Sequence, residues 1–370
     1  MPSSSRLLIF LLLFLPSGGR ESASAIAQTP SILKPIATMD ENRAGHTATL
    51  LADGGVLIAG GFKKAANGRD QIYSQTAEIF DPRTRGFSAT GEMTYRRTGH
   101  TATLLRNGLV LIAGGFAEMG TLSSAELYDP ANKSFTPIGN MSIRRGGLTA
   151  TILLDGRVLL CGGGDREAPA SAEIYDPMTK KFTPTGNMTV PRNAHTATRL
   201  PGGLVLIVGG SSRRYAVLAS SEIYNPATGR FIATANMEVM RYKHGATQNN
   251  DGDVLVFGGS DDRDWRGKLV SVERYAFATG KFIKLPDLQR ARFKLPNALV
   301  GFEDGTILVA GGNAALELYS PATGSSSIVG SLDNPYYYST ATVLHGDSVL
   351  IAGGYDDQLR ATNKAWIWSK

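Results

Sequence analysis

The stretch from Arg97 to Pro130 reads RTGHTATLLRNGLVLIAGGFAEMGTLSSAELYDP, and its pattern predicts three consecutive β-strands. Its first part alternates polar and apolar residues, as a half-buried strand does. After an Asn-Gly turn signal, a wholly apolar segment ends in the diglycine Gly114-Gly115, which suits a strand that is packed on both faces. A third segment carries Glu126 and ends at an Asp-Pro turn signal.

The same pattern recurs along the 370 residues. Seven diglycines end an apolar segment: Gly60-Gly61, Gly114-Gly115, Gly162-Gly163, Gly209-Gly210, Gly258-Gly259, Gly311-Gly312 and Gly353-Gly354. Successive diglycines lie between 42 and 54 residues apart. A period near fifty that is composed of strands is typical of a β-propeller with one four-stranded sheet per blade.

Two further positions repeat in register with the diglycines. A Glu occurs in the third segment at Glu78, Glu126, Glu173, Glu222, Glu273 and Glu317, and a Phe marks a short fourth segment at Phe87, Phe135, Phe182, Phe231 and Phe282. With these residues the chain resembles the Kelch family over residues 31–370. The resemblance implies an all-β, seven-bladed propeller of Kelch type with four antiparallel strands per blade. The usual Trp of the fourth strand is Phe here, as in secreted bacterial members and in the galactose-oxidase-like branch.

The seventh unit predicts how the propeller closes. After its third strand, over residues 365–368, the sequence ends, so this unit has no fourth strand of its own. Residues 31–39 precede the first unit, and their Ile36 to Met39 segment is similar to the end of a fourth strand. We therefore expect residues 31–39 to complete the last blade, which removes the open edges that would invite aggregation.

The N-terminus predicts export. Arg6 precedes an apolar run at residues 7–15 that is too short to cross a bilayer as a helix, and small residues follow it. We expect a signal peptide over residues 1–27 and a single propeller domain over residues 28–370; a retained anchor is the alternative. The protein is then secreted or periplasmic, and its lone Cys161 excludes an internal disulfide.

Charge and hydropathy limit the partners. The formal net charge is +6, spread along the chain without a Lys/Arg run, so we expect no nucleic-acid partner. No later apolar run reaches membrane-spanning length. We expect a monomer that binds an unknown protein or glycan ligand.

Histidine and cysteine are the residues that could indicate metal chemistry. One repeat position carries His46, His100, His195 and His244, and we expect these imidazoles to bond to backbone near the start of each first strand. A copper-radical site of the galactose-oxidase kind requires a Tyr cross-linked to a Cys. The only cysteine, Cys161, occupies a core position before a diglycine, so we expect no metal and no cofactor.

A recurring arginine has two interpretations. It lies three residues before the His position, at Arg43, Arg97, Arg145, Arg192 and Arg241, with Lys294 and Tyr336 in the last two units. A ring of guanidinium groups could bind an anionic ligand. Alternatively, each Arg pairs with the Glu of a third strand. The seventh unit favours the pair, because Tyr336 and Trp366 replace both charges together.

Strand direction locates the expected binding face. Loops before first strands and loops between second and third strands share one end of the propeller, and the opposite end carries only tight turns. The long loops are residues 62–76, 211–220, 260–271 and 355–363. They contribute Tyr215, Trp265 and Arg266 as candidate binding residues. Solvated loops without a partner are the alternative.

The sequence therefore favours a non-catalytic protein- or carbohydrate-binding module that uses its long-loop face. The alternative is a metal-free sugar mutarotase that resembles the periplasmic sialic-acid anomerase, with a mouth Arg holding the sugar carboxylate and a Glu as acid or base. The fold does not choose between them, because one propeller supports both kinds of function.

Overall fold

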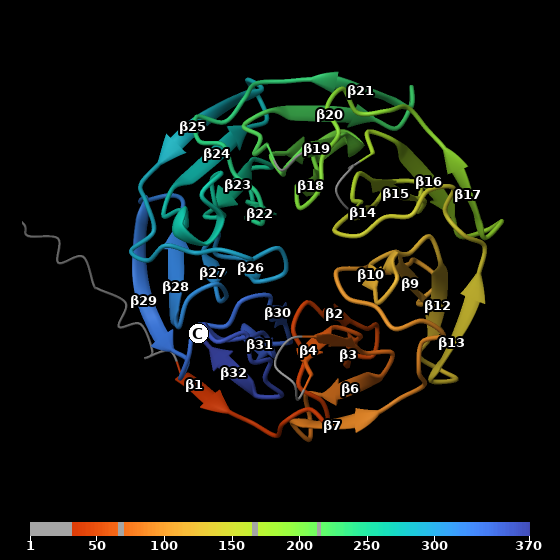
Figure 1. Cartoon of the computed structure of the whole chain (residues 1–370). Coiled ribbons are helices and arrows are strands. Elements are labelled where there is room, and N and C mark those ends of the chain that lie inside the picture. The colour runs from red at the N-terminus through yellow and green to blue at the C-terminus, as the bar shows by residue number, and fades with distance from the viewer. Residues whose placement is uncertain (1–31, 66–69, 165–168, 213–215) are drawn as a thin grey trace, which may run out of the picture. The chain divides into compact units, whose positions relative to one another are not determined.

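The computed structural model describes residues 32–65, 70–164, 169–212 and 216–370, so Tyr215 lies outside the described residues. Seven four-stranded antiparallel sheets surround a common centre, and this confirms the predicted seven-bladed propeller (Figure 1). In six blades the chain runs from the innermost strand outwards and then crosses to the next blade.

The two inner strands of each blade follow the predicted patterns. The innermost strands are β2 (Thr47–Leu50), β8 (Thr101–Leu104), β14 (Thr149–Ile152), β18 (Thr196–Arg199), β22 (Gly245–Gln248), β26 (Leu299–Gly301) and β30 (Thr340–Val343). The second strands are β3 (Val56–Ala59), β9 (Val110–Ala113), β15 (Val158–Cys161), β19 (Val205–Val208), β23 (Val254–Phe257), β27 (Ile307–Val309) and β31 (Ser348–Ala352). The apolar residues of the second strands are buried throughout, because neighbouring blades cover both of their faces.

The two outer strands carry the repeated Glu and the aromatic pair. The third strands are β6 (Ala77–Asp81), β12 (Ala125–Asp129), β16 (Ala172–Asp176), β20 (Ser221–Asn225), β24 (Val272–Ala276), β28 (Ala315–Ser320) and β32 (Ala365–Ser369). The outermost strands are β7 (Gly86–Ala89), β13 (Ser134–Ile138), β17 (Lys181–Pro184), β21 (Arg230–Ala233), β25 (Lys281–Leu285), β29 (Ser325–Ser331) and β1 (Ile32–Pro35). In the second blade, the rings of Tyr128 and Phe135 pack across this strand pair with 4.7 Å between centroids.

Shorter elements lie in the loops between second and third strands. They are the hairpins β4 (Phe62–Lys64) with β5 (Gln71–Tyr73) and β10 (Phe116–Ala117) with β11 (Gly120–Thr121), and the 3-10 turn η3 (Asp264–Arg266). A second 3-10 turn, η1 (Pro201–Gly203), joins β18 to β19 at the opposite end. Within the described ranges, no helix is long and apolar enough to cross a bilayer.

The diglycines bring neighbouring blades into contact. Gly60 has φ +65°, and a Cβ on it would lie 2.5 Å from the carbonyl oxygen of Arg97 in the next blade. The N–H of Gly61 donates to that carbonyl at 2.9 Å. The same bond recurs from Gly115, Gly163, Gly210, Gly259, Gly312 and Gly354 to Arg145, Arg192, Arg241, Arg292, Tyr336 and Arg43. A side chain at the first glycine would therefore push two blades apart.

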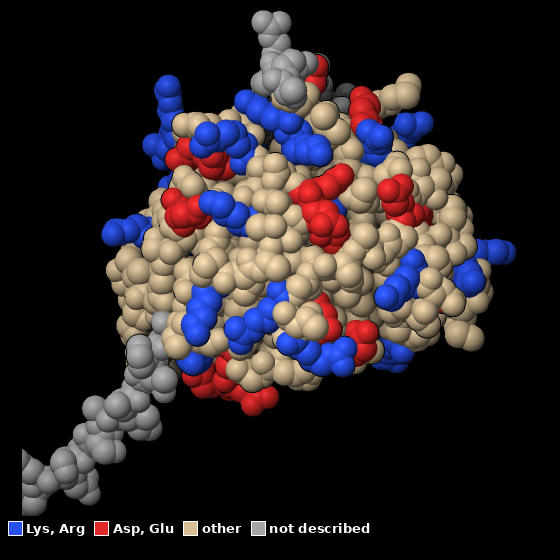
Figure 2. Space-filling view, turned by 90° about the horizontal axis from the view of Figure 1, so that it is seen from below, with Lys and Arg blue, Asp and Glu red and all other residues tan. Residues whose placement is uncertain are grey.

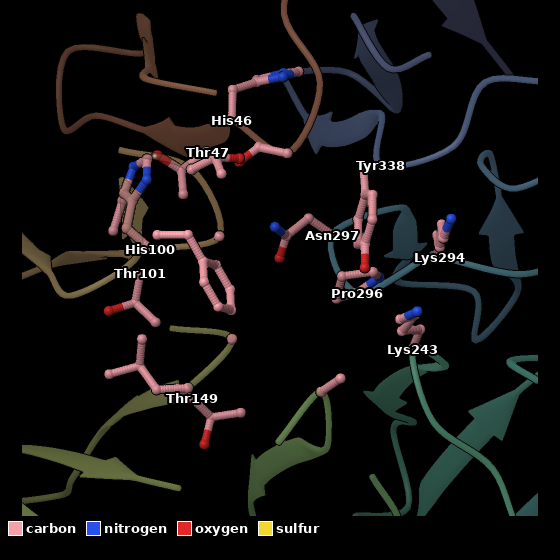
Figure 3. A pocket seen from close by; sticks show the side chains of 18 of the residues that line it. His46, Thr47, His100, Thr101, Thr149, Lys243, Lys294, Pro296, Asn297 and Tyr338 are labelled. Atoms are coloured by element: carbon pink, nitrogen blue, oxygen red, sulfur yellow. Dashed lines mark hydrogen bonds between the residues drawn. The ribbon is translucent and has the colours of Figure 1, made fainter. Parts of the chain in front are cut away.

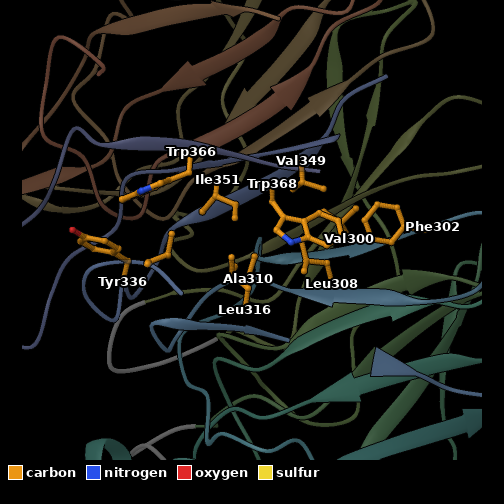
Figure 4. Packing of buried hydrophobic residues seen from close by; sticks show 11 residues of the cluster. Val300, Phe302, Leu308, Ala310, Leu316, Tyr336, Val349, Ile351, Trp366 and Trp368 are labelled. Atoms are coloured by element: carbon orange, nitrogen blue, oxygen red, sulfur yellow. The ribbon is translucent and has the colours of Figure 1, made fainter. Parts of the chain in front are cut away.

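The hydrophobic core lies between the blades and not within them. Figure 4 shows the cluster between blades six and seven, where Trp368 packs 5.7 Å from Phe302. Trp368 is fully buried, and its indole N–H donates to the carbonyl of Val329 at 3.3 Å. Each blade is thus stabilised by its two neighbours, as in other repeat folds.

Polypeptide from the two ends of the described chain completes the seventh blade. Strand β1 pairs antiparallel with β32, with Ile32 opposite Ser369 and Pro35 opposite Trp366, and the two strands lie side by side in Figure 1. Met39 is buried at the following junction. The predicted closure by the N-terminal segment is confirmed for residues 32–39.

Removing residues 32–39 is expected to destabilise the whole propeller. The deletion exposes the edge of β32 and the core between blades seven and one, so we expect a lower melting temperature in a single cooperative transition. Differential scanning calorimetry measures this change. An unchanged melting temperature would contradict the role of β1 in closure.

Candidate functional site

Seven backbone hydrogen bonds form a closed ring at the mouth of the central channel. In each blade one residue shortly before the innermost strand donates its N–H to the carbonyl of the corresponding residue in the preceding blade, at 3.0–3.1 Å. We call these residues the inner ring: Gly45, Gly99, Gly147, Ala194, Lys243, Lys294 and Tyr338. All have φ between 48° and 66°. Glycine suits this left-handed conformation best.

The inner ring is asymmetric. Blades one to four present Gly or Ala, whereas blades five to seven present Lys243, Lys294 and Tyr338. A large side chain in left-handed backbone costs about 1 kcal/mol or more, and such residues concentrate at functional sites. Sequence reasoning missed Lys243 as a mouth residue. The signal in the sequence is a Lys directly before the repeated His position, where blades one to three have Gly.

The inner ring borders a cavity of about 700 Å³, which is within the size range of small-molecule sites. Figure 3 shows Lys243, Lys294 and Tyr338 on one side of it, facing Thr101 and Thr149 across the opening. Asn297 directs its amide towards the open centre. Blades five to seven thus contribute the lysines of the inner ring and Tyr338. Blades one to four contribute Gly, Ala and Thr residues together with His46, Phe62, Lys64, Gln71, Tyr73, His100, Phe116, Leu148 and His195.

Lys294 lies among aromatic rings. Its Nζ is 4.6 Å from the ring centroid of Phe293 and 5.0 Å from that of Tyr355, and it donates a hydrogen bond to the Tyr355 hydroxyl. Burial, and then the positive charge of Lys243, lower the pKa of Lys294 to about 8. Burial raises the pKa of Tyr355 well above its usual value, so this hydroxyl keeps its proton.

Lys243 belongs to the same cluster but has a carboxylate partner. Its Nζ lies 3.4 Å from Asp264 Oδ1 and 4.4 Å from the ring centroid of Tyr242, whose hydroxyl also donates to Asp264. Burial lowers the pKa of Lys243. Burial opposes ionisation of Asp264, but the Tyr242 hydrogen bond and the Lys243 charge outweigh it and hold the pKa of Asp264 below its usual value.

The third lysine connects the cluster to the predicted loop residues. Lys268 Nζ lies 3.7 Å from the ring centroid of Trp265 and donates to the Tyr337 hydroxyl at 2.6 Å. Tyr337 in turn donates to Asp357 at 2.9 Å. Trp265 is partly exposed in η3, and the exposed Arg266 follows it. The structure thus brings Trp265 into contact with this cluster through Lys268 and Tyr337, whereas neither Trp265 nor Arg266 lines the cavity.

The five arginines that could form a ligand-binding ring lie elsewhere. Arg43, Arg97, Arg145, Arg192 and Arg241 are buried in ion pairs of 2.6–3.0 Å with Glu78, Glu126, Glu173, Glu222 and Glu273. Each guanidinium also donates to the carbonyl of the first glycine of the diglycine. These groups are held by the protein itself and do not reach the cavity.

One arginine position requires a correction. In the sixth blade Arg292, and not Lys294, pairs with its third-strand residue, Glu317, at 3.0 Å. In this blade two additional residues, Leu295 and Pro296, separate the inner-ring residue Lys294 from Asn297, which occupies the His position. The residue three positions before Asn297 is therefore Lys294, whereas the residue equivalent to the other arginines is Arg292. In the seventh blade the pair is aromatic: Tyr336 and Trp366 are both buried, and their ring centroids lie 5.4 Å apart (Figure 4).

The four repeated histidines connect neighbouring blades. Their Nε2 atoms lie 2.9–3.1 Å from Thr hydroxyls of the preceding blade, in the pairs His46 with Thr340, His100 with Thr47, His195 with Thr149 and His244 with Thr196. The expected bond from imidazole to backbone was therefore wrong, because each Nε2 atom is bonded to a Thr hydroxyl of the adjacent innermost strand. Burial lowers the pKa of His46 and of His195 to about 3.

Cys161 is a buried thiol at the end of β15. Its Sγ lies 3.2 Å from the Thr149 hydroxyl and 3.7 Å from His195 Nε2. Burial raises the pKa of the Cys161 thiol to about 11, which keeps it protonated and unreactive.

Comparison with known proteins agrees with this architecture. The Kelch motif family matches residues 96–142 and 146–189, which span most of blades two and three. The chain is a seven-bladed β-propeller with Kelch motifs in its second and third blades. Among curated proteins no sequence match is found. A solved structure of a fungal alcohol oxidase of the AA5 family, in complex with copper, matches this Kelch propeller with a TM-score of 0.73 and 17% identity over 92% of this chain and 76% of that chain.

The donor groups at the mouth of this Kelch propeller do not fit a copper site. The cavity wall offers lysine ammonium groups and tyrosine hydroxyls, while the histidine Nε2 atoms are bonded to threonine hydroxyls and Cys161 lies beside Thr149. Among the described residues, no three His, Cys, Asp or Glu side chains gather as metal ligands would. The similarity to the oxidase concerns the fold.

We predict that the buried ion pairs stabilise the blades. Arg97→Ala leaves the Glu126 carboxylate buried without its cation and is expected to lower the free energy of unfolding by about 3–5 kcal/mol in urea denaturation. The exposed neighbour Arg96 gives a control, since Arg96→Ala is expected to change the free energy of unfolding by about 0.5 kcal/mol or less. Equal effects of the two variants would contradict a stabilising role for the pair.

The histidines predict a loss of stability in acid. Between pH 6.5 and about 3 the unfolded chain binds a proton at His195 that the folded chain does not, so each pH unit of acidification costs up to about 1.4 kcal/mol per histidine. His195→Leu, which copies Leu148 of blade three, should reduce the slope of unfolding free energy against pH in this range. The exposed His345→Gln is the control and should retain the slope. A wild-type slope in His195→Leu would contradict the assignment.

Proposed function

We propose that this Kelch propeller is a non-catalytic recognition module that binds an acidic carbohydrate in the mouth cavity. The observation that carries the proposal is the lysine–aromatic cluster at the inner ring. Lys243 and Lys294 line one side of a 700 Å³ cavity with their ammonium groups beside aromatic rings, and Lys268 lies behind them between Trp265 and Tyr337. Among the described residues, no carboxylate lies within ion-pair distance of Lys294.

This combination suits a sugar that carries a carboxylate. Tyr338 is half-buried and lines the cavity, so its ring offers a flat apolar surface that suits the C–H face of a sugar ring, and its hydroxyl can bond a sugar hydroxyl. An ammonium group in partly desolvated surroundings attracts an anion more strongly than it does in water. The intermixed charges on the side of the propeller in Figure 2 offer no comparable single-sign surface.

The buried arginines favour binding over the mutarotase alternative. That alternative requires an accessible mouth Arg to hold the sugar carboxylate, whereas the five predicted arginines and Arg292 are enclosed in ion pairs. We further propose that the N-terminal leader exports the protein, so that the cavity meets glycans outside the cytoplasm.

A pair of matched sugars tests the proposal. We expect methyl glucuronide to bind more tightly than methyl glucoside in isothermal titration calorimetry, by about tenfold or more, because only the former carries a carboxylate. Lys294→Met should remove most of this preference. Lys133→Met, an exposed change in the turn between β12 and β13, is the control and should leave it unchanged.

The pKa of Lys294 predicts the pH dependence of binding. Because the free site has a pKa of about 8 and a bound anion raises it, affinity should be constant below pH 8 and fall by up to about tenfold per pH unit above it. Titrations between pH 6 and 10 measure this dependence. Equal affinity for both sugars, or affinity that does not change above pH 8, would overturn the proposal.

A further inference from the structure

The amino group of Lys294 has surroundings that favour covalent chemistry as well as ion pairing. Lys294 holds a left-handed backbone conformation with φ 63°, borders the cavity, and lies within 4.6–6.0 Å of four ring centroids, those of Phe293, Tyr337, Tyr338 and Tyr355. A lysine that is desolvated by apolar groups and lies next to another cation is the kind that forms imines with carbonyl compounds.

The other two lysines of the cluster differ from Lys294 in their partners. Lys243 is paired with Asp264, and Lys268 donates to Tyr337, which is bonded to Asp357. A nearby carboxylate stabilises the protonated amine and so suppresses its nucleophilicity. Lys294 instead donates to a neutral hydroxyl, that of Tyr355.

The titratable groups around Lys294 support the same assignment. They are Lys243, Asp264, Lys268, Tyr337, Tyr338 and Tyr355. Burial and the charges of Lys243 and Lys268 lower the pKa of Lys294, and the charge of Asp264 opposes them only in part. At pH 8 about half of the molecules therefore carry a neutral amine with a free electron pair at this position.

We propose that Lys294 forms a reversible imine with the carbonyl group of an open-chain aldehyde acid or keto acid, and that Lys243 holds the carboxylate of the same molecule. Both side chains border the same side of the cavity (Figure 3). The inference rests on the proposed function for the position of the acidic ligand and adds a covalent bond to it. A reducing uronic acid carries both groups when its ring is open.

The reaction balances without an oxidant or a reductant. The electron pair of neutral Lys294 Nζ attacks the carbonyl carbon, the C–N bond forms, and one N–H proton passes to the former carbonyl oxygen. The C–O bond then breaks as the second N–H proton joins the departing hydroxyl, which leaves as water. The Tyr355 hydroxyl, which keeps its own proton, is placed to relay both protons between nitrogen and oxygen.

Reductive trapping tests the proposal. The full chain is incubated with pyruvate and cyanoborohydride, and peptide mass spectrometry reports which lysines are modified. At pH 7 we expect modification of Lys294 to be faster than that of exposed lysines such as Lys133 and Lys281, by up to roughly a hundredfold, because a much larger fraction of its amine is neutral. The rate should rise with pH and level off above pH 8. Lactate, which has no ketone or aldehyde group, should give no product.

Variants separate the covalent step from binding. Lys294→Arg keeps the positive charge but cannot form an imine, so it should lose trapping at position 294 while the exposed Lys133 and Lys281 are still modified at their wild-type rates. Tyr355→Phe should slow trapping at an unchanged melting temperature. Lys243→Met should slow trapping of pyruvate more than that of the uncharged acetone.

The outcomes distinguish the two proposals. If methyl glucuronide binds but Lys294 is modified no faster than Lys133, the imine is wrong and the proposed function stands. If Lys294 is trapped while methyl glucuronide does not bind, the covalent site stands and the acidic-sugar function is wrong. If the wild-type protein shows neither, both are wrong.

Discussion

The bond from the second glycine of each diglycine to the next blade is the contact on which the structure depends. It requires two backbones to meet where any side chain would collide, as the 2.5 Å approach of a Gly60 Cβ to the Arg97 carbonyl shows. The bond recurs around the whole propeller and ends with Gly354 donating to Arg43. Because the blades have their apolar faces towards each other, this close approach is also what allows the core to be packed without gaps.

The buried ion pairs follow from that contact. The carbonyl that accepts this bond, such as that of Arg97, lies in the segment that connects the outermost strand of one blade to the innermost strand of the next. This connecting segment must be held in place against the blade that it enters. Arg97 does this by bonding to Gly114, Ser124 and Glu126 at once. The seventh blade has the packed, tilted rings of Tyr336 and Trp366 in the same place, so an apolar pair replaces the buried ionic one there.

The repeat is broken at the inner ring. Seven equivalent residues form the inner ring, but only blades five to seven give it long side chains. The resulting lysine–aromatic cluster lies on one side of the cavity, which would give the proposed ligand a defined orientation. The AA5 oxidase shares the propeller, while the donor groups at the mouth here are amines and phenols. The same scaffold therefore presents different chemistry through a few positions.

The sequence by itself determined the number of blades, the strand order within them and the closure by residues 32–39, because period, turn signals and apolar patterning are local properties. It also indicated that the Arg and Glu of a blade belong together. The tertiary structure decided which charged residues line the cavity. Lys243 and Lys294 are 51 residues apart and become neighbours only when their blades pack together. The additional Leu295 and Pro296 displace Asn297 from the repeat spacing, so that Arg292 and not Lys294 occupies the buried pair. Repeat spacing predicts equivalence between positions, but the direction of a side chain depends on backbone conformation and on the neighbouring blade.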